Sequence, residues 1–236
     1  MTKKLVNHVK KTFGVTFNDE SVLVEAFTHS SYANDHREQN IRNLERLEFL
    51  GDAVLELTVS QYLYTKYPNH PEGQLTRMRA SIVRAESLAS LAKAYDLHLF
   101  VRLGKGEEQM NGRNRPSLLC DVFEAFIGSV FVDQGMDVVL EVLKEILFPK
   151  IDSGAFSHGM DHKTALQELL QKNGVVTIQY KVVDKRGPDH RREFVVEVFV
   201  EGDSFGRGSG RSKKAAEQAA AKQALESLEE EKNSGV

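Results

Sequence analysis

The sequence lacks several features that would narrow its class at once. Its 236 residues include a single cysteine, so no disulfide can form within the chain, as is usual in a reducing compartment. No apolar run reaches the roughly 18 residues that a membrane-spanning helix needs. The first residues, MTKKLVNHVKKTFG, also lack the apolar core of a signal peptide. We therefore expect a cytoplasmic protein with no membrane segment.

A large charge of one sign is missing as well. The formal net charge is −3, and residues 160–228 carry 12 basic and 10 acidic side chains. Such a weak overall field does not attract a polyanion by itself. A surface that binds nucleic acid would therefore have to be a local patch.

Hydrophobic residues make up 41% of the chain, enough to fill a core. Over residues 1–148 they recur at helical spacing, which predicts an all-α domain. The predicted helices span 20–29, 44–67, 74–95, 117–134 and 137–148. Asp137 is the predicted N-cap of the last helix, and the polar, glycine-containing segment 99–116 is predicted to be a loop.

The pattern changes after residue 148. Residues 149–160 carry Pro, Gly and Ser without a period, which predicts a linker. Residues 161–229 are predicted to form an α+β domain in the order α-β-β-β-α, and residues 230–236 an acidic tail. The elements of this domain are predicted over 162–173, 176–184, 191–200, 203–209 and 212–229, with a hairpin turn at Gly202-Asp203. The predicted fold class is therefore two domains, the first all-α and the second α+β.

Four acids interrupt the apolar helix predicted over 44–67. At about 100° per residue they fall within an arc of roughly 80°; they are Glu45, Glu48, Asp52 and Glu56. A solvent-facing surface would explain such a stripe, but solvated helix faces usually carry lysines and arginines too. Carboxylates about 4 Å apart also repel each other by several kcal/mol. The stripe therefore indicates a place where a cation balances the charge.

A second apolar segment, 118–131, is interrupted only by Asp121 and Glu124, which share one helix face. The small residues Ala125 and Gly128 beside Glu124 would let another helix approach closely. Packing of the two acidic helices there would bring together the carboxylates of Glu48, Asp52, Asp121 and Glu124. Carboxylate oxygens are the ligands that Mg²⁺ and Mn²⁺ prefer, so the sequence predicts a site for one of these ions.

Four motifs resemble segments of the ribonuclease III family, whose members cut double-stranded RNA. ERLEFLGDA (45–53) and RPSLLCDVFEAFIG (115–128) resemble its two acidic helices. FTHSSY (27–32) and EGQLTRMRASIV (72–83) resemble further segments, in the expected order. The resemblance covers nearly the whole chain. One departure is Leu44, where the family often has asparagine, and it bears on the start of the first acidic helix.

This resemblance implies a role for each acid. The ligands of the divalent metal would be Glu48, Asp52, Asp121 and Glu124, with Mg²⁺ as the ion and Mn²⁺ as a substitute. Asp52 and Glu124 would matter most for catalysis, and Glu45 would lie further out, near the subunit interface or the RNA. Glu56 matches no family role and is assigned to packing or a salt bridge. His29, beside two serines, is assigned as a buried, hydrogen-bonded histidine.

The second domain resembles the double-stranded-RNA-binding domain, on its α-β-β-β-α order and GPDH (187–190). Such a domain reads the A-form shape of the duplex rather than its sequence. A lysine pair opens its last helix, where the helix dipole attracts phosphate; the alternative is an ordinary solvated helix. The resemblance implies three contact regions: Thr164, Gln167 and Glu168 on the first helix, Pro188 and His190 in the loop, and Lys213 and Lys214 across the major groove.

Together the resemblances imply a metal-dependent endoribonuclease without an organic cofactor. It would hydrolyse double-stranded RNA to 5′-phosphate and 3′-hydroxyl ends and would process precursor ribosomal RNA and some mRNA. Because a duplex has two strands related by a dyad, a homodimer with one acid cluster per chain fits the task. Two alternatives are a catalytically inactive double-stranded-RNA-binding protein and an unrelated helical Mg²⁺ enzyme acting on diphosphates. The complete acid set argues against the first, and the RNA-binding module against the second.

Overall fold

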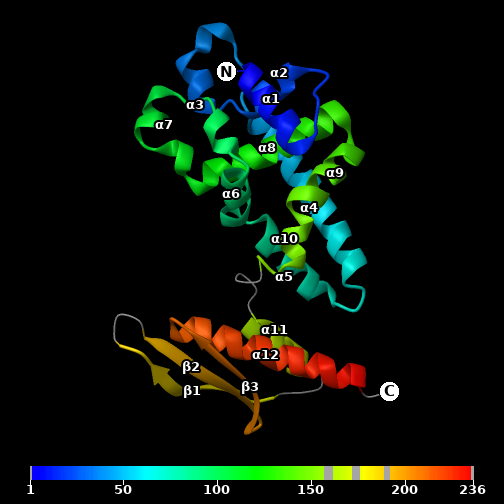
Figure 1. Ribbon diagram of the computed structural model, residues 1–236, viewed down its shortest axis with the longest axis vertical. Coiled ribbons are helices and arrows are strands. Elements are labelled where there is room, and N and C mark those ends of the chain that lie inside the picture. Colours follow the sequence, from blue (N-terminus) through cyan, green and yellow to red (C-terminus); the bar gives the residue numbers. More distant parts are fainter. Residues whose placement is uncertain (1, 157–161, 172–175, 189–191, 235–236) are drawn as a thin grey trace. The chain divides into compact units, whose positions relative to one another are not determined.

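The computed structural model describes residues 2–156, 162–171, 176–188 and 192–234 (Figure 1). The chain divides into two compact units, Met1–Gly159 and Met160–Val236. The first unit is helical and the second combines helices with a sheet, which confirms the predicted fold class. No helix in the described ranges is long and apolar enough to cross a bilayer.

The first unit is built from helices of very different length. They are α1 (Thr2–Phe13), α2 (Glu20–Ala26), α3 (Ser30–Asp35), α4 (Glu45–Lys66), α5 (Glu72–Val83), α6 (Ala85–Ala94), α7 (Lys105–Gln109), α8 (Pro116–Gln134), α9 (Met136–Ile146) and α10 (Phe148–Asp152). Short 3-10 turns join some of them: η1 (Arg37–Gln39), η2 (Leu97–Phe100) and η3 (Gly112–Asn114). Helix α1 was not predicted, and it packs through the buried residues Leu5 and Val9.

Several sequence predictions for this unit are wrong in detail. The helix predicted over 74–95 is two helices, because Arg84 between α5 and α6 has an extended backbone (φ −66°, ψ 155°). The apolar spacing runs across that break and so gives no sign of it. Asp137 lies in the first turn of α9, whose N-cap is Gly135. The segment 99–116, predicted to be a loop, contains α7.

Helices α4 and α8 form the centre of the first unit and touch at two glycines. A Cβ atom on Gly51 would collide with the backbone carbonyl of Glu124, and one on Gly128 with that of Leu47. Both partners are helix backbone, which cannot move aside as a flexible side chain can. Because the two backbones approach this closely, the side chains that flank the glycines on either helix are brought together.

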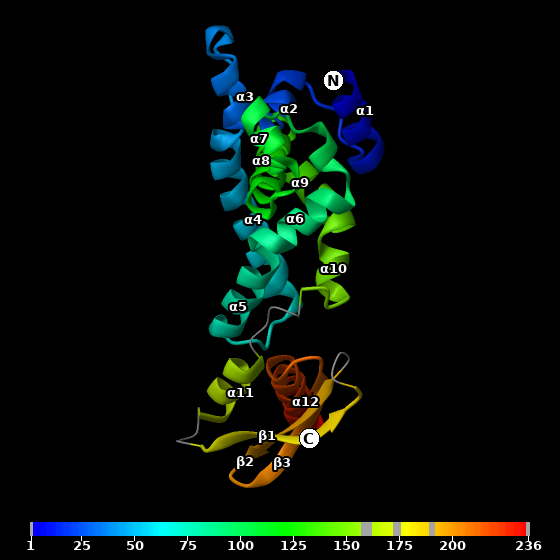
Figure 2. The ribbon, with the colours of Figure 1, turned by 90° about the vertical axis from the view of Figure 1, so that its left-hand side faces the viewer.

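The second unit is a three-stranded antiparallel sheet covered by two helices. Its elements are α11 (His162–Gln171), β1 (Ile178–Arg186), β2 (Glu193–Val200), β3 (Asp203–Gly210) and α12 (Lys213–Ser234), with strand order β1-β2-β3. Figure 2 shows both helices on the same side of the sheet. Leu166, Val196, Val198 and four alanines of α12 form the core between them.

Local geometry explains two features of this unit. The tight hairpin between β2 and β3 turns at Glu201 and Gly202, whose φ values are 51° and 99°, one residue earlier than predicted, because Asp203 already begins β3. A Cβ on Gly208 of β3 would collide with the backbone of α12, so the strand needs glycine there. Helix α12 extends through most of the tail predicted over 230–236, and the linker predicted over 149–160 overlaps α10 at its start.

We predict that Gly128→Ala destabilises the first unit, because the added methyl group must push α4 and α8 apart. Overpacking of this kind costs about 1–3 kcal/mol or more, which should lower the melting temperature by several degrees. Gly106→Ala is the matched control, since a Cβ at that position of α7 meets nothing within 4 Å. Thermal unfolding followed by circular dichroism measures both; equal melting temperatures for Gly128→Ala and wild type would contradict the packing argument.

Candidate metal site and RNA-binding surface

The acids of α4 and α8 lie in one cluster beside the glycine contact. The carboxyl group of Glu124 interacts electrostatically with the carboxylates of Asp52, Asp121 and Glu48. Glu48 in turn interacts with Asp121, Glu45 and Asp52. The structure therefore brings together the four acids that the sequence predicted to converge. Glu56 lies one turn beyond Asp52 on α4 and is exposed.

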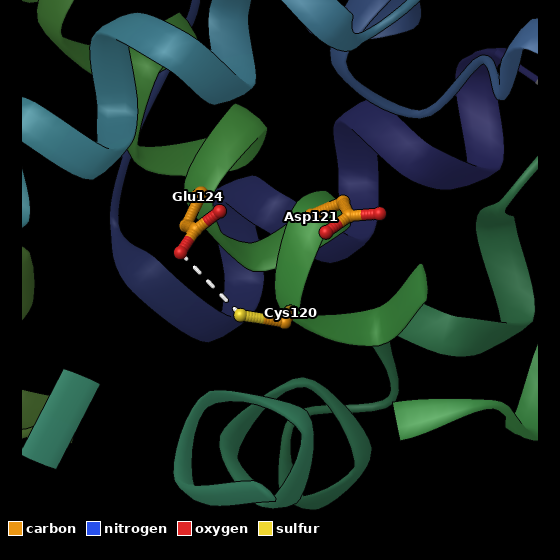
Figure 3. Close-up of side chains that lie close together, drawn as sticks. All are labelled: Cys120, Asp121 and Glu124. Carbon is orange, nitrogen blue, oxygen red and sulfur yellow. Dashed lines mark hydrogen bonds between the residues drawn. The ribbon is translucent and has the colours of Figure 1, made fainter. Parts of the chain in front are cut away.

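The members of this cluster differ in burial. Glu48, Asp121 and Glu124 are partly buried, whereas Glu45 and Asp52 are exposed. Figure 3 shows Asp121 and Glu124 on neighbouring turns of α8, with Cys120 beside them. Possible ligand atoms of these three residues lie within 4.8 Å of one another. Both acids of α8 are therefore partly shielded from solvent, whereas on α4 only Glu48 is, and Asp52 is open to solvent.

Cys120 is the residue that sequence analysis missed at this site. Its Sγ–H donates a hydrogen bond to Oε1 of Glu124, at 3.4 Å (Figure 3). The sequence spacing could have indicated this contact, because residues four apart on a helix are neighbours. Burial, together with the charge of Glu124, raises the pKa of the Cys120 thiol far above its usual value. The thiol therefore stays protonated and can donate to the carboxylate.

Burial and mutual repulsion make the acids hard to ionise. Burial is the largest cause of a rise in the pKa of Glu124 to about 7; the Cys120 hydrogen bond lowers it and the charge of Asp52 raises it. Burial also raises the pKa of Asp121 and, with the charge of Asp121, that of Glu48. In the described part of the chain, none of the four forms a salt bridge with lysine or arginine. The cluster therefore has excess negative charge.

Leu44, which departs from the family pattern, does not disturb the start of α4. Its side chain is buried, with 2% exposed, and its N–H donates to the carbonyl of Thr28 at 2.9 Å. The preceding residue, Asn43, accepts a hydrogen bond from the N–H of Glu45 at 3.2 Å. An asparagine side chain thus serves the helix start from one position earlier.

Exposed apolar side chains also run along α4, on a face next to that of the acids. Phe49 is 80% exposed, Leu57 58% and Tyr64 75%. Large hydrophobic residues are seldom exposed in a row on a helix of a monomeric protein. This face of α4 therefore has the character of a contact surface.

In the second unit, Lys213 and Lys214 are exposed at the start of α12. The Ser212 hydroxyl accepts a hydrogen bond from the N–H of Ala215 at 3.1 Å and so orders this helix start. Gln167 on α11 is exposed and lines a hollow with Lys163 and Tyr180.

Other predicted RNA contacts are described only in part. Pro188 is exposed in the loop after β1, and His190 lies outside the described residues. Thr164 and Glu168 lie on α11, where the structure describes their backbone but not their side chains.

Each of the two units matches a known protein family. Residues 19–151 match the family model described as Ribonuclease-III-like, and residues 162–228 match the double-stranded RNA binding motif. Ribonuclease 3 of Enterococcus faecalis is 53% identical over 228 residues, which cover 97% of this chain and 99% of the relative. Ribonuclease 3 of Geobacillus thermodenitrificans is 57% identical over 220 residues, covering 93% and 89%.

A solved structure agrees with these matches. The nuclease domain of ribonuclease III from Campylobacter jejuni superposes with a TM-score of 0.57 and 33% sequence identity, covering 61% of this chain and 99% of that domain. Family models and relatives together span both units and nearly the full length of the chain. The chain therefore belongs to the ribonuclease III family.

Proposed function

We propose that this ribonuclease III hydrolyses phosphodiester bonds of double-stranded RNA at the acid cluster, with a divalent metal ion bound there. One observation carries the proposal. Two helices in close contact at Gly51 and Gly128 bring four carboxylates together, and no lysine or arginine among the described residues forms a salt bridge with any of the four. A fold keeps such repulsion only where a cation offsets it. Metal binding is therefore the function that this geometry supports best.

The donor set fits a hard ion. Carboxylate oxygens from Glu48, Asp52, Asp121 and Glu124 suit Mg²⁺, with Mn²⁺ as a substitute. Cys120 adds a single sulfur beside these carboxylates, and its S–H donates to Oε1 of Glu124, so oxygen donors dominate the set. Bound at these residues, a divalent ion lowers the pKa of a coordinated water and stabilises negative charge on phosphate oxygens.

The acids differ in burial, and we assign their roles on that basis. Glu124 and Asp121 are partly buried on α8 and would fix the position of the ion. Asp52 is exposed on α4, where it would face both ion and substrate, and Glu45 is exposed at the helix start, where RNA can reach it. We propose products with 5′-phosphate and 3′-hydroxyl ends, and precursor ribosomal RNA and some mRNA as substrates.

A homodimer would supply the second acid cluster that the second strand needs. The exposed apolar residues on α4, which are Phe49, Leu57 and Tyr64, support a subunit contact along this helix. The Campylobacter jejuni nuclease domain is described as having a region involved in dimer formation. The second unit would hold the duplex through its exposed lysine pair, Lys213 and Lys214, and through the contacts on α11 and in the β1–β2 loop.

Glu124→Gln tests the metal role directly. The amide has almost the volume of the carboxyl group but lacks its charge, so we expect the cleavage rate of a long RNA duplex in Mg²⁺ to fall by about 10²-fold or more. Glu56→Gln is the matched control, because Glu56 is an exposed acid on α4 outside the predicted ligand set. It should cleave at the wild-type rate. Cleavage by Glu124→Gln near the wild-type rate would leave the α8 acids without a catalytic role.

The same variant should change stability in a pH-dependent way when a chelator removes metal. The folded protein holds the proton of Glu124 up to about pH 7, whereas the ordinary value is 4.5. Stability is therefore lost as pH rises through this range, by on the order of 1–2 kcal/mol once solvent screening of this partly exposed carboxyl group is included. We expect Glu124→Gln to melt several degrees above wild type at pH 8 and at nearly the same temperature at pH 4. A constant difference across this range would contradict the charge argument.

Lys213→Ala tests the RNA-binding surface, measured on the Glu124→Gln background so that the duplex stays intact. Losing one phosphate contact should weaken binding equally for every duplex sequence and reduce the slope of log affinity against log salt by about one. Lys93→Ala, an exposed lysine of α6, is the control. A changed sequence preference in Lys213→Ala, or an equal loss in the control, would count against a phosphate contact at α12.

A further inference from the structure

Hydrogen bonds fix the tautomer of His29, the residue before α3. Nδ1 of its ring accepts from the backbone N–H of Ser31 at 3.2 Å, as the N-cap of that helix. The Ser31 hydroxyl lies 2.8 Å from the same Nδ1, and it accepts from the N–H of Gly104 at 2.9 Å. Because Nδ1 accepts the backbone N–H, it carries no hydrogen, and the hydroxyl donates to it as well. The ring hydrogen of the neutral imidazole is therefore on Nε2.

Backbone contacts place this ring beside the acid cluster. The N–H of His29 donates to the carbonyl of Arg102 at 3.0 Å, and the carbonyl of Thr28 accepts from the N–H of Leu44 at 2.9 Å. His29 is thereby tied next to the first turn of α4, which begins at Glu45. Its ring also interacts electrostatically with Asp121 on α8. His29 thus lies near the start of α4, and its ring is within electrostatic range of Glu45 on α4 and Asp121 on α8.

Charge and exposure make this ring a neutral donor. Burial is the largest influence on the pKa of His29 and, with the positive charge of Arg115, holds it below its usual value, against the pull of Glu107, Asp121 and Glu45. The side chain is only partly buried, whereas the sequence predicted a buried histidine. Within the described ranges of the chain, every hydrogen bond of the ring goes to Nδ1, so the Nε2–H group has no protein acceptor.

We propose that the Nε2–H group of His29 donates a hydrogen bond to a non-bridging phosphate oxygen of the RNA at the acid cluster. The inference rests on the proposed function, since it needs RNA to be cut there. A lysine or arginine in place of His29 would pair with the carboxylates and compete with the metal ion, whereas the nearby Arg115 is held in a salt bridge with Glu107 at 2.8 Å. A neutral donor binds the phosphate without reducing the charge that holds the ion. Nδ1 then accepts hydrogen bonds that stabilise the start of α3, in line with the hydrogen-bonded histidine predicted from the sequence, while Nε2 donates to the substrate.

Two substitutions separate these roles. His29→Asn places a side-chain oxygen near the position of Nδ1, so it keeps an N-cap acceptor for Ser31 but loses the outer N–H group. We expect its single-turnover cleavage rate in saturating Mg²⁺ to fall about 10-fold or more, with an unchanged melting temperature. His29→Gln carries an amide N–H that reaches further out, toward the position of Nε2, and should regain part of the rate.

Duplex affinity and Mn²⁺ affinity, measured on the same proteins, complete the test. Both should stay within about twofold of wild type in His29→Asn. A cleavage rate within twofold of wild type would overturn the inference. So would a tenfold loss of Mn²⁺ affinity, because His29 would then act through Asp121. Wild-type protein that fails to cleave duplex RNA in Mg²⁺ would instead contradict the proposed function itself, so the two failures are distinguishable.

Discussion

The close contact between α4 and α8 is the constraint on which the rest of the first unit depends. Gly51 and Gly128 let the backbones of the two helices meet, and any Cβ at either position would collide with the backbone opposite. The contact brings Glu48 and Asp52 of α4 within electrostatic range of Asp121 and Glu124 of α8, so carboxylates on separate helices repel one another. The same packing that stabilises the unit thus creates a charge cluster that opposes folding.

A bound cation would resolve this conflict, and the carboxylate oxygens of the cluster favour a hard one. Burial and repulsion raise the pKa of Glu124 to about 7, while Cys120 keeps its proton and stabilises the carboxylate by hydrogen bonding. The ring of His29 interacts electrostatically with Asp121, and we propose that its Nε2–H group donates to the RNA. Arg115 acts electrostatically on Asp121 but forms its salt bridge with Glu107, at 2.8 Å, so the acids keep a net negative charge that suits a divalent ion.

The sequence predicted those features of the site that depend on contacts between residues close together in the chain. The three-residue spacing of Asp121 and Glu124 and the small Gly128 beside them were sufficient to predict the meeting of two acidic helices. Gly51, the reciprocal glycine on α4, was overlooked because it stands inside an apolar run that any buried helix could have. Cys120 was recoverable from its distance of four residues to Glu124, since that spacing puts both on one helix face.

Contacts between distant segments explain what sequence patterns could not reach. The polar segment 99–116 was predicted to be a loop, yet Arg113 donates to the carbonyls of His98 and Val101 at 2.8 and 2.9 Å and pairs with Glu108. These bonds order the chain between η2 and α8. The tautomer of His29 likewise depends on Gly104, more than 70 residues away. Hydrogen bonds between such distant residues leave no periodic pattern in the sequence.

The most direct test of the account is to locate the ion. Crystals of the protein grown with Mn²⁺ and measured at a wavelength where manganese scatters anomalously would show its position without reference to any mutant. The account predicts a strong anomalous peak within ligand distance, about 2.0–2.3 Å, of carboxylate oxygens from both α4 and α8, Glu124 among them. An empty cluster at millimolar Mn²⁺, or a peak held only by residues of one helix, would contradict it.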